Sequence, residues 1–143
     1  MSFKFQPILN LRKHHEDNCR TRLKEEQLKL LEIEGELNVI EATKKQQEAE
    51  VERLAVGAIN MEYLLSGSKY LDYLRQKQEE TKVRRARQQE EVESAREILV
   101  EARKETKAME KLKEKKAREE MEAGLRLAQK NLDEMGIIQI YHS

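Results

Sequence analysis

The feature that most constrains the fold is a seven-residue repeat of apolar residues between residues 19 and 61. Its apolar members recur at alternating spacings of three and four residues. This spacing places one narrow apolar stripe along one side of an α-helix and is typical of coiled coils. The a positions are Leu23, Leu30, Leu37, Lys44, Val51 and Ala58, and the d positions are Cys19, Glu26, Ile33, Ile40, Gln47, Leu54 and Met61.

A second repeat begins at Tyr70 and predicts a second long helix. It is apolar at both ends and polar in the middle, between Gln78 and Gln88. After Met109 the apolar residues leave this register, and such a shift changes the supercoil locally. The repeat consists of Leu71, Leu74, Gln78, Thr81, Arg85, Gln88, Val92, Ala95, Leu99, Ala102, Thr106 and Met109, and the shifted residues are Leu112, Met121, Leu125, Ala128, Leu132 and Met135.

The segment between the repeats, residues 57–74, has a different character. It holds two glycines, three tyrosines and only three charged residues. Glycine and serine are common in turns, so we expect the chain to reverse between residues 57 and 68, with a short helix at residues 60–65. The prediction is an all-α fold, a long antiparallel coiled-coil hairpin in one domain of residues 1–143. Its arms are residues 5–56 and 69–136, followed by a tail at residues 137–143.

An antiparallel pairing of the arms about residue 67 aligns their apolar ends. It brings Leu37 opposite Leu99 and Leu23 opposite Leu112. Gly136 is the expected C-cap of the second helix, because glycine is favoured just after a helix end.

Composition excludes an ordinary globular core. Charged residues make up 39% of the 143 residues, aromatic residues make up 4%, and the chain has one Pro and no Trp. Too few bulky apolar side chains remain to fill a core at normal density. A disordered chain or long helices sharing a narrow stripe remain, and the many strong helix formers favour helices.

Charge and motif content argue against several functions. The formal net charge is zero, which argues against a nucleic-acid binder, although basic clusters at residues 82–87 and 111–118 keep an RNA- or DNA-binding helix pair as an alternative. No apolar run is long enough to cross a membrane. His15 and Cys19 lack a further ligand pair, and no phosphate loop or nucleophile elbow occurs. We expect no enzyme activity, no metal and no cofactor.

The few aromatic residues lie at two places. Tyr63, Tyr70 and Tyr73 either plug the end of the hairpin or are displayed to a partner, since tyrosine is well suited to interfaces. Phe3 and Phe5 precede the first helix, where Pro7 is tolerated in the first turn. These two rings are either a contact with the second arm or an exposed binding feature.

Four further segments are informative when taken in order: FKFQPILNLRKHHEDNCRTRL at residues 3–23, YLDYLRQKQ at 70–78, REILVEARKETKAMEKLKEK at 96–115 and LDEMG at 132–136. Together they resemble the FliJ family of flagellar type III export proteins. The resemblance implies a cytoplasmic protein, monomeric when free, that is similar in shape to the γ stalk of rotary ATPases. It also implies peripheral association with the inner membrane through the export apparatus.

The resemblance further implies three partners: the hexameric export ATPase, the cytoplasmic domain of the export gate, and export chaperones. It suggests a role in coupling ATPase action and proton-motive force to export. The implied gate-contacting residues are Ile40, Tyr70, Tyr73 and Leu74, although nearby positions are charged or polar (Glu36, Thr43, Gln47, Lys77 and Thr81). The implied ATPase-contacting residues are Phe3, Phe5, Leu9, Arg12, Leu132 and Met135.

Two alternatives remain open beside this one. The virulence-secretion stalk proteins of the YscO type share the same plan. A generic structural coiled coil, as a parallel dimer or a filament, would show similar repeats.

Overall fold

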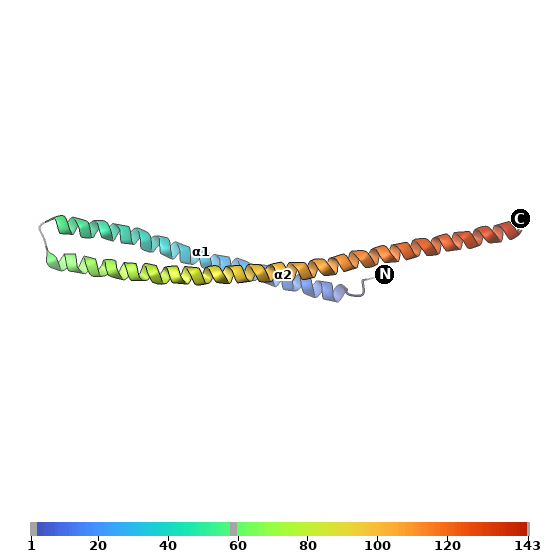
Figure 1. The fold of residues 1–143 in the computed structure, drawn as a ribbon, viewed down its shortest axis with the longest axis horizontal. Coiled ribbons are helices and arrows are strands. Elements are labelled where there is room, and N and C mark those ends of the chain that lie inside the picture. The colour runs from blue at the N-terminus through green and yellow to red at the C-terminus, as the bar shows by residue number, and fades with distance from the viewer. Residues whose placement is uncertain (1–2, 58–59, 143) are drawn as a thin grey trace. The chain divides into compact units, whose positions relative to one another are not determined.

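The fold consists of two long helices. The computed structural model describes residues 3–57 and 60–142, with the backbone alone at residues 138, 139, 141 and 142. Helix α1 spans Gln6–Val56 and helix α2 spans Met61–His142 (Figure 1). The described residues contain no strand. The predicted all-α fold is therefore confirmed.

Local residues and backbone hydrogen bonds explain where helix α1 begins and ends. Pro7 lies in the first turn, where its missing N–H leaves no helical hydrogen bond unmade. The amide of Leu9 already donates to the carbonyl of Phe5, at 3.0 Å. At the other end the amide of Gly57 donates to the carbonyl of Arg53, at 3.2 Å.

Helix α2 begins at Met61, not near residue 69 as predicted. Asn60 is its N-cap: the side-chain Oδ1 accepts from the amide of Glu62 at 3.0 Å, and the carbonyl accepts from the amide of Leu64 at 3.2 Å. Asparagine is among the best N-cap residues. The reversal is therefore confined to residues 57–60, and residues 60–65 form no separate short helix.

The predicted end of the second helix is also wrong. Helix α2 continues through Gly136 to His142. None of the described glycines has a positive φ, so Gly136 does not adopt the left-handed conformation of a glycine C-cap. Ala58, expected in the seam, lies outside the described residues, as does Ser143 of the predicted tail.

Within each of two compact units the helices run antiparallel. One unit contains residues 19–99 and the other contains residues 1–18 and 100–143. In the first unit Gln47 binds Gly67, Glu36 binds Arg84 and Arg22 lies 3.8 Å from Glu91, so numbers fall along α2 as they rise along α1. In the second unit the ion pairs are Arg12–Glu105 and Glu16–Arg103.

The predicted register between the arms is wrong. Glu36 is ion-paired with Arg84 at 2.8 Å, so the adjacent Leu37 lies level with the Arg84 turn. Leu99 is fifteen residues further along α2, about 22 Å at 1.5 Å per residue. The expected pairing of Leu37 with Leu99 is thus excluded. The register differs because the chain reverses at residues 57–60 rather than near residue 67.

The predicted seam itself is confirmed. The a and d positions from Cys19 to Leu54 and from Leu71 to Met109 are buried or half-buried, whereas neighbouring positions are mostly exposed; the expected d position Met61 is exposed. The core is therefore one narrow line of side chains along each unit. Its buried members are Leu9, Cys19, Ile33, Leu37, Leu71, Leu74, Thr81, Val92, Ala95, Leu99, Ala102 and Thr106.

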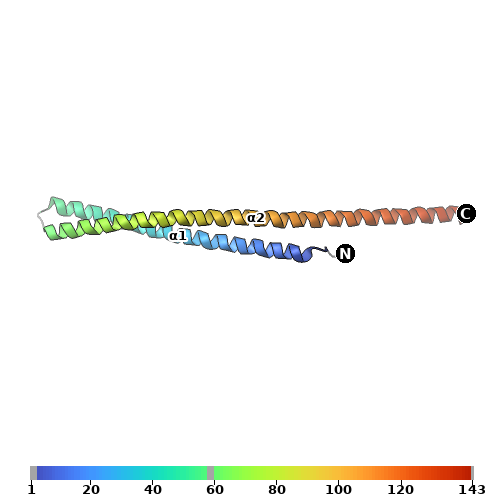
Figure 2. The same ribbon diagram turned by 60° about the horizontal axis from the view of Figure 1, so that its bottom comes forward.

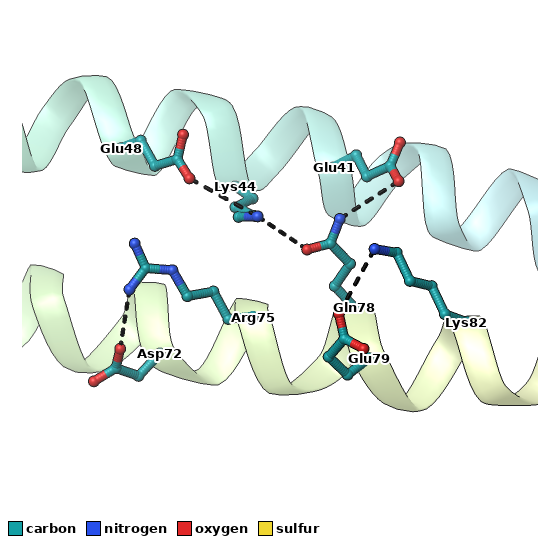
Figure 3. Close-up of polar contacts among 8 residues, drawn as sticks. All are labelled: Glu41, Lys44, Glu48, Asp72, Arg75, Gln78, Glu79 and Lys82. Carbon is teal, nitrogen blue, oxygen red and sulfur yellow. Dashed lines mark hydrogen bonds and ion pairs between the residues drawn. The ribbon is translucent and has the colours of Figure 1, made fainter.

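Two pairs of polar seam residues, Lys44 with Gln78 and Glu26 with Gln88, are hydrogen-bonded between the helices. Lys44 donates to the side-chain oxygen of Gln78 at 3.0 Å, and the amide of Gln78 reaches Glu41 at 3.4 Å (Figure 3). Further along, Gln88 Nε2 donates to the carbonyl of Glu26 at 2.9 Å and to its carboxylate. No described buried side-chain N or O lacks a partner. Such matched polar layers favour one register, because a shift would leave them unpaired.

Candidate partner-binding surfaces

Three exposed tyrosines share one side of the first turns of α2, near the place where the chain reverses. We call this the tip surface: Tyr63, Tyr70 and Tyr73. The rings of Tyr70 and Tyr73 are stacked, with centroids 6.2 Å apart and planes at 17°. Each side chain of the tip surface is at least 44% exposed. The tyrosines are thus exposed. The sequence had left open equally whether they are buried at the end of the hairpin or displayed.

The tip surface includes a shallow hollow of about 520 Å³ between the helices. Tyr63 and Tyr70 line it from α2, and Glu50 and Arg53 line it from α1. From the sequence, Tyr63 was placed in the turn, because Asn60 was not recognised as the N-cap of α2.

The hollow depends on close packing at Gly67. A Cβ there would lie 3.2 Å from Gln47 Nε2 and 3.3 Å from Val51 Cγ2. Gln47 Nε2 also donates to the carbonyl of Gly67, at 3.2 Å. Glycine lets the two backbones approach at this point, so Gly67 belongs to the seam of α2 and not to a turn.

The four predicted gate residues do not form one surface. Leu74 is only 4% exposed, a core member of the seam. Ile40 is half-buried and lies near the level of Gln78, since Gln78 contacts Glu41. That level is about two helical turns from Tyr70. Only Tyr70 and Tyr73 of this set lie together and accessible.

The N-terminal aromatic pair packs beside α2. Phe3 and Phe5 are half-buried and meet edge to face, with centroids 5.7 Å apart. Together with Lys113, Lys116 and residues 117 and 120 they line a hollow of about 430 Å³. The two rings therefore face α2 across an open hollow, an arrangement that leaves both sequence interpretations open.

The other predicted ATPase residues of α1 have structural contacts. Leu9 is 1% exposed and belongs to the core. Arg12 is ion-paired with Glu105 at 2.9 Å, with both side chains nearly half exposed. An exposed pair of this kind contributes little to stability, about 0–1 kcal/mol. Arg12 can therefore exchange partners at small cost.

The C-terminal part of α2 continues past the beginning of α1 (Figure 2). Every described side chain from residue 121 to residue 135 is exposed. Apolar residues nevertheless recur there at spacings of four and three, as in a coiled coil. We call this face the overhang stripe: Met121, Leu125, Ala128, Leu132 and Met135.

The two ends of the predicted ATPase set are separate. The hollow beside Phe3 and Phe5 ends at Glu120 of α2, and Leu132 lies twelve residues beyond it. This corresponds to about 18 Å along the helix. Leu132 and Met135, with exposed fractions of 62% and 58%, belong to the overhang stripe alone.

The basic clusters are partly neutralised. In the first, Arg84 binds Glu36 at 2.8 Å, and Lys82 lies 3.6 Å from Glu79 (Figure 3). In the second, Lys116 lies 3.4 Å from Glu119. A hydrogen bond from Gln88 lowers the pKa of the Glu26 carboxyl, and a hydrogen bond from Arg53 lowers the pKa of the Glu50 carboxyl.

Metal and membrane sites were searched among the described residues. No group of three His, Cys, Asp or Glu side chains in residues 3–57 and 60–142 could hold a metal ion. Over the same residues neither helix has an apolar stretch sufficient to span a bilayer.

Comparison with known proteins gives one family and one structure. The family model described as the flagellar FliJ protein matches residues 1–143. A solved structure described as that of a proposed YscO homologue, CT670 from Chlamydia trachomatis, is 24% identical. That match covers 99% of this chain and 95% of the other, with a TM-score of 0.49. No curated protein matches.

Proposed function

Because the chain belongs to the flagellar FliJ family, we propose that it is a non-enzymatic component of a flagellar type III export apparatus. It acts in the cytoplasm by binding, at the inner membrane but not within it. Its partners are the hexameric export ATPase, the cytoplasmic domain of the export gate, and export chaperones. It helps couple ATPase action and proton-motive force to export. The observation that carries the proposal is the family match over the whole chain.

The overhang stripe supports contact with the ATPase. Contact of apolar side chains with water is unfavourable. A row of exposed apolar residues at coiled-coil spacing is therefore typical of a surface that a partner covers. A single helix is about 10 Å thick, which is narrower than a helix pair and suits insertion into an opening of a ring. The hollow beside Phe3 and Phe5 is the second proposed contact with the ATPase.

Stimulation of a purified export ATPase tests this proposal. The wild-type protein should raise the ATPase rate or promote ring assembly. Leu132→Ser/Met135→Ser should abolish the effect without changing helicity, because both side chains are exposed. Val83→Ser on α2, also exposed, is the control and should behave as wild type. An ATPase that responds equally to all three proteins, or to none, would count against the proposal.

The tip surface is the proposed contact for the gate. Stacked, exposed tyrosines offer large apolar rings with polar ends, as protein interfaces often do. Tyr70→Ala/Tyr73→Ala should weaken binding to the purified cytoplasmic domain of the gate at least tenfold, measured by calorimetry. Unchanged gate affinity would remove the tip surface from the proposal but leave the ATPase contact standing.

A further inference from the structure

Helix α1 carries a second apolar stripe on the side opposite its seam. Leu28, Leu31, Gly35 and Val39 follow one another at spacings of three and four residues, so they share one face. At 100° per residue, Leu31 points about 160° away from Ile33, and Leu28 points about 180° away from Leu37; Ile33 and Leu37 are buried. We call this face the outer stripe. It lies wholly within the unit of residues 19–99.

The outer stripe is strongly exposed. Leu28 and Leu31 are each 65% exposed and Val39 is 66% exposed. Leu28 and Leu31 also line a shallow hollow, together with Lys24, Gln27, Leu30 and Glu34. Single exposed apolar residues are ordinary, but a contiguous row bordering a hollow marks an interaction surface.

Gly35 fits this interpretation. A glycine inside a helix costs about 1 kcal/mol relative to alanine. Nothing in α2 requires it, since a Cβ at Gly35 would meet no atom within 4 Å. A position without a side chain between Leu31 and Val39 creates a notch, where a crossing helix can bring its backbone close.

Charge around the outer stripe favours one kind of occupant. Glu25, Glu32 and Glu34 lie on or beside it, and none has an ion pair or side-chain hydrogen bond among the described residues. Lys24 is the opposing charge at one end. A second copy is disfavoured, because pairing two stripes across Gly35 would gather Glu32 and Glu34 of both copies at one centre.

We propose that the outer stripe binds an amphipathic helix of another protein, with an apolar ridge flanked by Lys and Arg. The ridge crosses the notch at Gly35 between Leu31 and Val39. The flanking cations meet Glu25, Glu32 and Glu34. This contact goes beyond the proposed ATPase and gate contacts and involves none of their residues.

Synthetic peptides test the proposal without any other component of the apparatus. The probe is a helical peptide with a Leu stripe and Lys flanks. The comparisons are a peptide with the same Leu stripe and Glu flanks, and a Lys/Leu peptide of scrambled order. The full-length protein should bind the first peptide at least tenfold more tightly than the other two, by fluorescence anisotropy.

Variants then separate the apolar ridge, the notch and the charges. Leu28→Ser/Leu31→Ser and Gly35→Leu should each weaken peptide binding at least tenfold. Gly35→Leu should not lower the melting temperature, because leucine favours helix and has free space there. Glu32→Gln/Glu34→Gln should weaken binding several-fold and make it less sensitive to salt. Val83→Ser should bind as wild type.

Three outcomes would overturn the inference. They are equal binding of Lys- and Glu-flanked peptides, binding unchanged by Leu28→Ser/Leu31→Ser, and a dimer in sedimentation that the same double variant dissociates. The last would assign the stripe to a second copy of this chain. ATPase stimulation is measured in a separate assay. A failure of the proposed export function can therefore be distinguished from a failure of the proposed peptide binding.

Discussion

At the scale of single residues, Leu74 and Tyr73 are adjacent in sequence but differ in role. Leu74 is 4% exposed in the seam, whereas Tyr73 is 57% exposed on the tip surface. Leu74→Ala should lower the free energy of unfolding by about 2–5 kcal/mol, because a cavity adds to the lost burial. Tyr73→Ala should lower it by less than about 1 kcal/mol. Urea unfolding followed by circular dichroism measures both.

Equal losses in the two variants would show that the seam does not run through Leu74. The result also decides which variants can test the proposed gate contact. A variant that removes Leu74 damages the fold, so Tyr70 and Tyr73 are the residues to replace, and Leu74 is left out of the binding surface.

Glu26 gives the seam a dependence on pH. The hydrogen bond from Gln88 lowers the pKa of the Glu26 carboxyl below its ordinary value of 4.5, with further help from Lys29 and Arg22. A lowered folded pKa means that the ionised form is stabilised by folding. This contribution is therefore present above about pH 4.5 and is lost as pH falls through the folded pKa.

Glu26→Gln should therefore reduce the loss of stability between pH 7 and pH 3, as measured by urea unfolding at both values. Glu25→Gln is the matched control, since Glu25 lies on the exposed side of the same turn. If the two variants lose the same stability as wild type over this range, the Gln88 hydrogen bond has no energetic role.

At the scale of the elements, the overhang should be dispensable for folding. Its described side chains from residue 121 to residue 135 are exposed, so removing them takes away almost no buried apolar area. A chain ending at Glu120 should unfold at nearly the wild-type urea midpoint, while total helicity falls in proportion to its length. A large drop in the midpoint would mean that the overhang packs on another part of the chain.

The seam was predictable from the sequence because it depends only on spacing. Both repeats match the observed burial, from Cys19 to Leu54 and from Leu71 to Met109. The register was not predictable in the same way. Gly67 and the serines beside it are typical of turns, but close packing against Gln47 and Val51 outweighs that preference. Asn60, which caps α2, was the available signal for the correct boundary.

The binding surfaces were predicted less completely, for a related reason. Resemblance to a family assigns residues by position, and it does not distinguish a seam residue from a displayed one. Leu9 and Leu74 were named as contacts but are buried, whereas Tyr63 is exposed and was considered as a plug or a displayed residue without being among the contacts that the resemblance implies. The outer stripe did not emerge from the sequence, because the stronger repeat on the opposite side of α1 dominates the pattern.

At the scale of the whole molecule, the fold requires that both helices come from one chain. Residues that face each other across the two helices can then be crosslinked within one monomer. Gln88 Nε2 lies 2.9 Å from the carbonyl of Glu26, so these two positions are neighbours. In a Cys19→Ala background, Glu26→Cys/Gln88→Cys treated with a short bismaleimide should give a crosslinked monomer on a denaturing gel.

Leu37→Cys/Leu99→Cys in the same background is the control for register. These positions lie about 22 Å apart along the helix axis, beyond the reach of a short linker. Efficient crosslinking of this pair would restore the register expected from a reversal near residue 67. A parallel dimer, the generic coiled coil that the repeats also allow, would place Glu26 and Gln88 at different levels. It would give products between chains, through identical positions, that increase with protein concentration.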